Sequence, residues 1–361
     1  MEETMLKQKE TINSSKGETK NVREFGIKKK KNKEKQISPI AAAVPSENDQ
    51  VFDDLLDRFL TKKRTMVKQS TYSHYCEIIN NHIRPILGGL LVSQITGQVI
   101  DRFAGDKLEF GRLDGTGGLS AKNVRDILSV IKMTLDIAFA DEIISRKISF
   151  VKPRIQAKKI EILSPIEQNI ILSLGDSWNL REFGFYLCLQ TGLRIGEICA
   201  LQWSDIDFEN QLLKVNKTIL RIGDVSGAGK KTKIIFDTPK TQNSVRWIPL
   251  PDILLRKLEC RKKYAVSEEA FVLTGTNNYI EPRLYAYSYK RFLIKHQIKD
   301  CGFHALRHTF ATRCMEEGFD AKSLSELLGH SNVKITLERY VHPSMDLKRA
   351  HMKRLSEALA I

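Results

Sequence analysis

Hydrophobic residues between positions 51 and 147 recur with the period of an α-helix. The first stretch with this period predicts one helix. Similar patterns predict a second helix from about Thr71, a third near 97–110 and a long fourth helix capped by Ser120. Pro85 and the pair Gly88-Gly89 are expected to break the second pattern. We therefore predict a small helical domain of four main helices at residues 51–147. The stripe of the first helix, with i, i+3, i+4, i+7 spacing, consists of Phe52, Leu55, Leu56, Phe59 and Leu60.

The pattern changes in residues 163–361, where helical stretches flank a group of strand-like runs. The run Ser164-Pro165-Ile166-Glu167 is a capping box with proline at the first helical position. Gly318 and Gly329 are expected to end two helices, and Asp320 to cap the second of them. The predicted fold is mainly α with a small antiparallel sheet, so that an α+β domain follows the helical one. Strands are predicted at 212–215, 218–222, 233–236 and 244–250.

Three further segments complete the expected organisation. Residues 1–48 are rich in Lys, Glu, Ser and Asn, so we expect them not to fold and to serve as a solubilising tail or as a basic arm on DNA. Residues 148–162 are a basic linker containing Pro153. The closing segment 343–361 is amphipathic.

Composition narrows the class of protein. The chain has 361 residues and a formal net charge of +15, which favours attraction to polyanions. None of the six cysteines forms a C-x-x-C pair, so neither a zinc site nor a redox pair is indicated, and a reducing compartment is expected. The N-terminus lacks an apolar signal-peptide core and the apolar stretches are short, which predicts a soluble, cytoplasmic protein without membrane association.

Candidate chemistry is concentrated in four short islands. Arg194 follows a glycine turn at a helix start, and His304 and Arg307 lie three residues apart on one helix face. Two arginines and two histidines that converge would bind an anion, and the planar guanidinium fork matches a phosphate. Trp203 and Trp247 are interpreted as core residues. The islands are Thr191–Glu197, Pro239-Lys240-Thr241 with Arg246–Leu250, His304–His308, and Leu328-Gly329-His330 followed by Tyr340.

The anion is not expected to be a nucleoside triphosphate. The stretch 226–232 has the wrong glycine spacing for a phosphate-binding loop and is interpreted as a hairpin loop. Asp205, Asp207 and Glu209 are interpreted as loop or cap residues, so no metal and no cofactor are predicted. Tyr340 carries a phenol, and nearby cations would favour its ionised form. Such a phenol could attack a phosphodiester. The new ester would keep the energy of the bond that is broken, so the cleavage could be reversed.

In their order and separation, these islands resemble the signature boxes of the tyrosine recombinase (phage integrase) family. The resemblance covers about 51–361 and is strongest over 164–342. It implies a helical core-binding domain at 51–147 and a catalytic domain at 163–361. The closing segment 343–361 would then be an exchange helix that buries its apolar face in a neighbouring protomer or, alternatively, docks on its own domain. Any one box would be a weak signal, and Tyr340 alone would more often be a core aromatic; the joint occurrence of four boxes is specific. The boxes are Thr-Gly-Leu-Arg194-Ile-Gly-Glu, His304-x-x-Arg307, Leu-Gly-His330 and Tyr340.

The resemblance also implies roles for individual residues. Arg194 and Arg307 would clamp the scissile phosphate, and Tyr340 would attack it to leave a 3′-phosphotyrosine and a free 5′-hydroxyl. Lys240 would be the general acid for the leaving oxygen. Nearby lysines are alternatives for that role, namely Lys230, Lys231 and Lys233.

Four more residues receive supporting roles from the same resemblance. His304 would assist proton transfer from Tyr340, and His330 would hydrogen-bond the phosphate. Glu197 lies one turn beyond Arg194 and would orient another active-site side chain without contacting the phosphate itself. His308 is expected to do the same.

The implied activity is that of an integrase of a phage or conjugative transposon, acting on double-stranded DNA with specific recombination sites. The protein is expected to be a monomer when free and a homo-tetramer on DNA, with an accessory excisionase or DNA-bending protein as a further partner. Alternatives are a recombinase that resolves chromosome dimers, a non-catalytic DNA-binding protein of the same fold, and a type IB topoisomerase.

Overall fold

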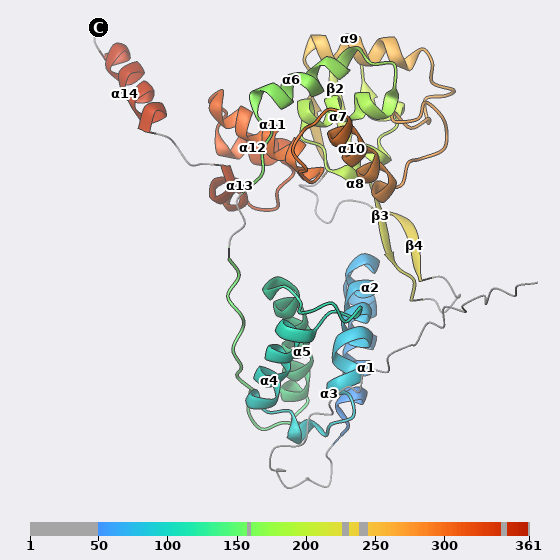
Figure 1. Cartoon of the computed structure of the whole chain (residues 1–361), viewed down its shortest axis with the longest axis vertical. Helices are drawn as coiled ribbons and strands as arrows, with labels where there is room; N and C mark the ends of the chain where they lie inside the picture. The colour runs from blue at the N-terminus through green and yellow to red at the C-terminus, as the bar shows by residue number, and fades with distance from the viewer. Residues whose placement is uncertain (1–49, 157–159, 226–230, 238–244, 341–344, 360–361) are drawn as a thin grey trace, which may run out of the picture. The chain divides into compact units, whose positions relative to one another are not determined.

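The computed structural model describes residues 50–156, 160–225, 231–237, 245–340 and 345–359. The expectations for the N-terminal segment 1–48, for Lys240 and for Lys230 concern residues outside these ranges. Figure 1 shows the helices and strands of the described parts.

The regular elements of residues 50–156 are all helices. One face of α1 is buried through Phe52, Leu55, Leu56 and Phe59, as its stripe predicts. Ser120 caps α5 by accepting a hydrogen bond from the backbone N–H of Asn123 at 3.2 Å. The elements are α1 (Phe52–Met66), α2 (Gln69–Ile78), a π-helical turn (Ile79–Ile83), α3 (Arg84–Leu87), a 3₁₀ turn (Val92–Gln94), α4 (Gly97–Phe110) and α5 (Ala121–Ala140).

The second helical pattern ends at Leu87, directly before Gly88-Gly89, as expected, but Pro85 itself does not break it, so that part of the prediction is wrong. The helical run continues through the π-helical turn Ile79–Ile83 into α3, which has proline at its start. Proline lacks an N–H and its ring collides with the preceding turn of a regular α-helix. The wider spacing of the π-turn directly before Pro85 accommodates the ring without ending the run.

The second part combines helices with short strands. The capping box is present: Ser164 Oγ accepts from the Glu167 N–H at 3.4 Å, and Glu167 Oε2 accepts from the Ser164 N–H at 2.7 Å. The helices are α6 (Pro165–Ser173), α7 (Leu180–Thr191), α8 (Ile195–Ala200), α9 (Asp252–Lys262), α10 (Pro282–Lys295), α11 (His304–Glu316), α12 (Ala321–Leu328), α13 (Val333–Tyr340) and α14 (Met345–Leu359), with 3₁₀ turns at Leu174–Asp176 and Trp203–Asp205.

The strands form two small antiparallel sheets. One has the order β1-β2-β5, with Leu213 opposite Ile248 and Val215 opposite Arg246, and the other pairs β3 with β4. The predicted strand 212–215 has the observed bounds, whereas β1 was not predicted. The chain is mainly α with small antiparallel sheets, as expected. The strands are β1 (Ile206–Asp207), β2 (Leu212–Val215), β3 (Thr218–Gly223), β4 (Thr232–Asp237) and β5 (Arg246–Pro249).

Alternation along β5 decides which side chains reach the core. Arg246 and Ile248 are buried, while Trp247 is 47% exposed and lies beside the Lys214 ammonium. The interpretation of Trp247 as a core residue is therefore wrong, because it lies on the opposite face of the strand from Ile248. Trp203, by contrast, is fully buried.

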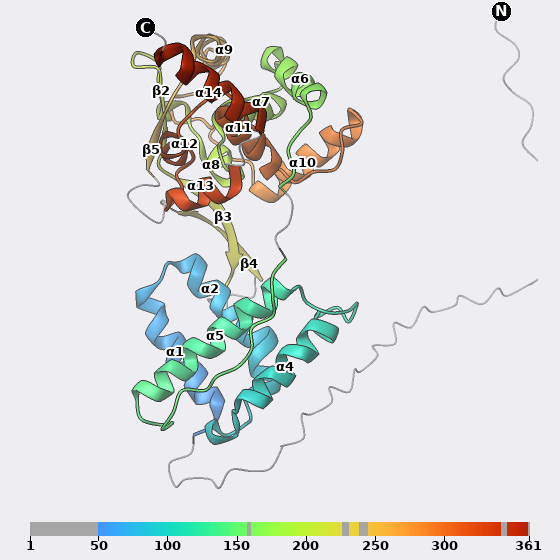
Figure 2. The same ribbon diagram turned by 90° about the vertical axis from the view of Figure 1, so that its left-hand side faces the viewer.

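Two left-handed glycines shape the turns beside the candidate site. Gly192 ends α7 with φ 66°, and Gly329 ends α12 with φ 62°. Asp320 caps α12 by accepting from the N–H groups of Lys322 and Ser323, each at 2.9 Å. Helices α11, α12 and α13 pack against one another (Figure 2). In the described part of the chain, no helix has the length and apolar character needed to cross a membrane.

Candidate active site

The C-terminal end of α12 gathers three arginines from distant parts of the chain. Its last carbonyls have no partner within the helix and carry the negative end of the helix dipole. Arg246 Nε donates to the Leu327 carbonyl at 2.6 Å, and Arg307 Nη2 donates to the Leu328 carbonyl at 2.6 Å. Arg194 Nη2 donates to the Gly329 carbonyl at 3.0 Å. Three consecutive carbonyls thus fix three guanidinium groups.

Glu197 joins two of these arginines. Its carboxylate accepts from Arg194 Nη1 at 2.7 Å and from both terminal nitrogens of Arg246, at 3.1 and 2.9 Å. It also accepts from the Arg194 backbone N–H at 2.9 Å. Burial alone would raise its pKa, but the hydrogen bonds and positive charge of Arg246 and Arg194 outweigh burial and lower the pKa to about 2. Glu197 is therefore ionised, and its hydrogen bonds position Arg194.

Arg307 is the most enclosed of the three arginines, with 1% of its surface exposed. Its Nη1 donates to the carbonyl of Gly192, in the left-handed turn that precedes Arg194, at 2.8 Å. Burial, followed by the nearby Arg194, lowers the pKa of Arg307 to about 9, which leaves the guanidinium charged at neutral pH. The two bonded carbonyls use two of its five N–H donors.

Tyr340 ends α13 and lies in a small core with Leu324 and Leu328 of α12. Only 8% of its surface is exposed, and its hydroxyl lies 2.6 Å from Nδ1 of His308. Burial raises the pKa of the phenol, while the charges of Arg307, Arg339 and Arg194 oppose that rise. The hydroxyl is therefore within electrostatic reach of two arginines held by α12.

The histidines of the site surround this phenol. The ring of His330 is parallel to that of Tyr340 at 6.5 Å, and its Nδ1 lies 2.8 Å from the Thr336 hydroxyl. The ring of His304 contacts that of His308 edge-on at 4.7 Å. Burial, then the arginine charges, lowers the pKa of His308 to about 4 and of His330 to about 3. Both rings are neutral at neutral pH.

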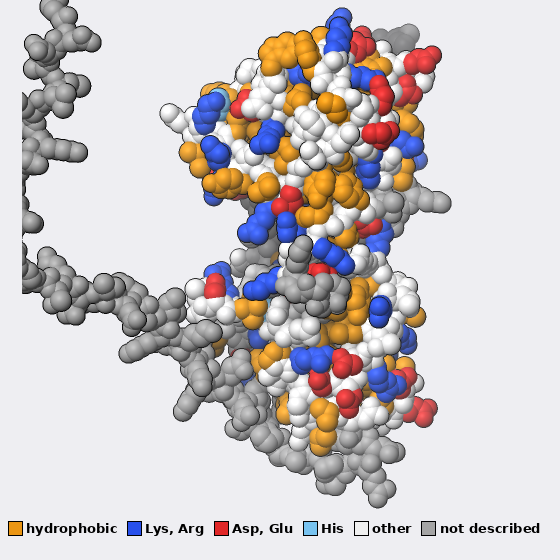
Figure 3. Space-filling view, turned by 90° about the vertical axis from the view of Figure 1, so that its right-hand side faces the viewer, with side chains coloured by type: hydrophobic (Ala, Val, Ile, Leu, Met, Phe, Trp, Pro, Cys, Tyr) orange, Lys and Arg blue, Asp and Glu red, His pale blue; other side chains and the backbone are white. Residues whose placement is uncertain are grey.

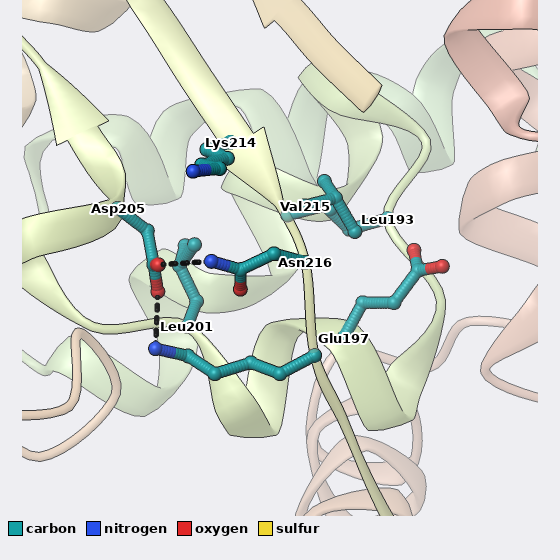
Figure 4. A pocket seen from close by; sticks show the side chains of 8 residues that line it. Leu193, Glu197, Leu201, Asp205, Lys214, Val215 and Asn216 are labelled. Atoms are coloured by element: carbon teal, nitrogen blue, oxygen red, sulfur yellow. Dashed lines mark hydrogen bonds and ion pairs between the residues drawn. The ribbon is translucent and has the colours of Figure 1, made fainter. Parts of the chain in front are cut away.

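Asp205 and Asp207, which follow α8, have ion-pair or hydrogen-bond partners within the protein. Asp205 pairs with Lys217 at 3.0 Å and accepts from Asn216 at 3.3 Å, and the Glu197 carboxylate points away from it (Figure 4). Asp207 accepts from the backbone N–H of Asn210 at 2.9 Å. Within the described ranges, no group of three or more His, Cys, Asp or Glu side chains could hold a metal ion.

The structure brings seven of the eight predicted site residues into one neighbourhood. The hydrogen bonds and ring contacts above link Arg194, Glu197, His304, Arg307, His308, His330 and Tyr340. Lys240 lies outside the described residues. Among its alternatives, Lys233 pairs with Asp224 at 3.5 Å. The roles assigned to these residues stay predictions.

Arg246 is the site residue that the sequence analysis left without a role. It shares the strand parity of Ile248, a buried neighbour, so alternation along 244–250 indicated that its charge points inward. A buried arginine needs an acidic partner, and Glu197 supplies it. That partner could not be identified, because 49 residues separate the two side chains.

Positive charge predominates at the site. Arg194, Arg246 and Arg307 face the single carboxylate of Glu197, so the cluster favours binding of an anion. Elsewhere on the surface, Lys and Arg side chains alternate with Asp and Glu and with hydrophobic groups, on the face seen in Figure 3. Fixed guanidiniums beside a buried phenol are suited to phosphoryl transfer to that phenol.

The fold and the site, with fixed guanidinium groups beside a buried phenol, can be compared with those of known proteins. The model of the phage integrase family matches residues 176–346, and the model of the phage integrase N-terminal SAM-like domain matches residues 51–108. The chain belongs to the phage integrase family.

Individual relatives are similar over different shares of their length. A XerC-like tyrosine recombinase of Caldanaerobacter subterraneus subsp. tengcongensis is 38% identical over 44% of this chain and 44% of its own length. The chain thus spans less than half of that relative. The ICEBs1 integrase of Bacillus subtilis is 29% identical over 81% of this chain and 78% of its own. A Tn1549 transposon integrase, solved with transposon right end DNA, is 26% identical, with TM-score 0.67, over 85% of this chain and 100% of that one.

Proposed function

We propose that the protein is a site-specific DNA recombinase, an integrase of a mobile element, that cuts and rejoins DNA through a covalent bond to Tyr340. The observation that carries this proposal is the environment of the Tyr340 hydroxyl. It bonds to His308 at 2.6 Å, and the charges of Arg307 and Arg194 act on it. A phenol beside two fixed guanidiniums can attack a phosphodiester that the guanidiniums bind.

In the proposed reaction, Arg194 and Arg307 bind the nonbridging oxygens of the scissile phosphate. Their preset positions, held by Gly329, Leu328 and Gly192 carbonyls, mean that little reorganisation is needed as charge develops on the phosphorane. The Tyr340 oxygen forms a bond to phosphorus while the bond from phosphorus to the 5′ oxygen breaks. The 3′-phosphotyrosine keeps the energy of the broken bond, so a DNA hydroxyl can reverse the step.

The remaining roles follow the predictions made from the sequence. Lys240 protonates the leaving 5′ oxygen, His330 hydrogen-bonds the phosphate and His304 assists proton movement near Tyr340. Glu197 acts through Arg194, which it anchors with two hydrogen bonds.

Double-stranded DNA carrying specific recombination sites is the proposed substrate, and a homo-tetramer assembled on it from free monomers is the proposed active form. The apolar face of α14 supports exchange between protomers, since Met345, Met352, Leu355 and Leu359 are all at least half exposed. An accessory excisionase or DNA-bending protein belongs to the same proposal. The similarity to the ICEBs1 and Tn1549 integrases favours a mobile-element integrase over a chromosome-dimer-resolving recombinase.

A covalent-trapping experiment tests the proposal. Duplexes that bind the purified protein are first selected from a random-sequence library. They are then rebuilt with a nick near the cleavage point, so that cleavage releases a short fragment and traps the adduct. The wild-type protein should accumulate a protein–DNA adduct, and Tyr340→Phe should bind the same duplex without forming one. An adduct formed at the normal rate by Tyr340→Phe would contradict the proposal.

The same substrates distinguish the alternatives. A recombinase should hold two duplexes in one complex and exchange their strands, whereas a type IB topoisomerase should relax supercoiled DNA as a monomer without pairing duplexes. A non-catalytic DNA-binding protein should bind and form no adduct at all.

A further inference from the structure

His308 makes the closest polar contact with the Tyr340 phenol. The distance from its Nδ1 to the hydroxyl oxygen is 2.6 Å, a short hydrogen bond, and the two ring centroids are 5.7 Å apart. His304, to which the sequence analysis assigned proton transfer, contacts the ring of His308. Its own ring has no hydrogen bond to another described residue. His308 is therefore placed to accept the phenol proton directly when its Nδ1 carries no proton.

The surroundings keep that acceptor in its neutral form. The groups that face His308 are His304 and Arg307 on its own helix, and Arg339 and Tyr340 on α13. Burial and the two arginine charges lower the pKa of His308 to about 4, so the ring carries a single proton at neutral pH. When the phenol donates its O–H in this contact, Nδ1 is the unprotonated nitrogen and the ring proton lies on Nε2.

From this geometry we infer, on the basis of the proposed function, that His308 is the base that accepts the Tyr340 proton during strand cleavage. The Tyr340 O–H bond breaks and an N–H bond forms on Nδ1 of His308. At the same time the phenolic oxygen bonds to phosphorus and the 5′ oxygen leaves with a proton from the general acid. In the rejoining step His308 returns its proton to the phenol.

This arrangement makes proton transfer depend on DNA. Without a phosphate, Arg307 and Arg339 disfavour an imidazolium at His308. A bound phosphate brings negative charge to Arg307, which offsets that repulsion and makes the ring more basic. The phenol is thus activated when a phosphodiester occupies the site and stays protonated when the site is empty.

The test compares substitutions at His308 with one at a histidine away from the site. His308→Gln keeps a hydrogen-bonding side chain but cannot take up a proton, and His308→Gly leaves space for a small base. His296→Gln is the control, because His296 lies at the C-terminal cap of α10 and its ring packs, tilted, against that of Phe292. Adduct formation on the nicked substrate is measured in single turnovers between about pH 4 and 9, a range that includes the lowered pKa of His308, together with DNA affinity and circular dichroism.

His308→Gln should bind DNA normally and form the adduct about 100-fold more slowly, the usual contribution of a general base, and it should lose the acid limb of the pH profile. Added imidazole should restore a large part of the rate in His308→Gly, which a purely structural role does not predict. His296→Gln should match the wild type.

A normal rate of adduct formation in His308→Gln would overturn the inference. An increased rate in His308→Gly would do so too, because it would show that the contact only restrains Tyr340. The third contrary result is a folded His308→Gly protein that imidazole does not rescue. If the wild-type protein itself forms no adduct, the proposed function fails instead. The two failures are therefore distinguishable.

Discussion

Replacing Glu197 with glutamine tests how the arginine cluster is held together. The carboxylate accepts four hydrogen bonds, two from Arg194 and two from Arg246, and is 9% exposed. Glutamine offers one acceptor oxygen, and its amide nitrogen would face guanidinium N–H groups that it cannot bond. Two arginines would then lack their negative partner, and Arg246 is almost completely buried.

The expected loss of stability follows from the pKa. Lowering the pKa of Glu197 from 4.5 to about 2 corresponds to about 3 kcal/mol of preference for the charged form. Removing one partner of a buried ion pair costs about 3–5 kcal/mol in other proteins. We therefore expect Glu197→Gln to lower the free energy of unfolding by about 3 kcal/mol at pH 7.

Urea unfolding followed by tryptophan fluorescence measures this difference, since Trp203 is fully buried in the same core. Glu259→Gln, an exposed substitution on α9, is the matched control and should stay within about 0.5 kcal/mol of the wild type. The folded-state pKa lies below the unfolded one, so the contribution of Glu197 is complete above pH 4.5 and is lost as the pH falls towards 2. An unchanged free energy of unfolding at pH 7 in Glu197→Gln would refute the reasoning.

Three further outcomes are expected. Gly329→Ala should lower the free energy of unfolding by about 1–3 kcal/mol and slow adduct formation. Its φ is 62° and the new Cβ would lie 3.1 Å from Arg246. An unfolding free energy and an adduct rate equal to those of the wild type would contradict this. Arg307→Lys should lower cleavage at least about 100-fold, since lysine cannot reproduce the bonds to two carbonyls. The lowered pKa values of His308 and His330 should make stability fall as the pH drops from 6.5 towards 4 for His308 and towards 3 for His330, by about 1 kcal/mol for each residue. The fall should be smaller in His308→Phe, and urea titrations at each pH would show this.

Local features of the fold were predictable because their causes are local. The capping box at Ser164 and the left-handed glycines at 192 and 329 depend on a few neighbouring residues, and the structure has all of them. The strand 212–215 follows from its own apolar pattern. Pro85 was misjudged because a π-turn, which has no simple sequence signal, accommodates it.

The site was predictable in its residue types but not in its pairings. The islands indicated that Arg194, Arg307 and Tyr340 would meet, yet the contacts that organise them depend on chain folding over long separations. The use of the α12 carbonyls as an anchor for three arginines has no sequence signature. The partnership of His308 with Tyr340, across 32 residues, likewise depends on how α11 packs against α13.

The most direct test of the account is to identify the residue that becomes attached to DNA. The trapped adduct is digested with nuclease and protease, and the peptide that carries a residual nucleotide is sequenced by mass spectrometry. The account predicts a single modified peptide in which the nucleotide is linked through its 3′ phosphate to the oxygen of Tyr340. Attachment to any other residue, or through a 5′ phosphate, would contradict it.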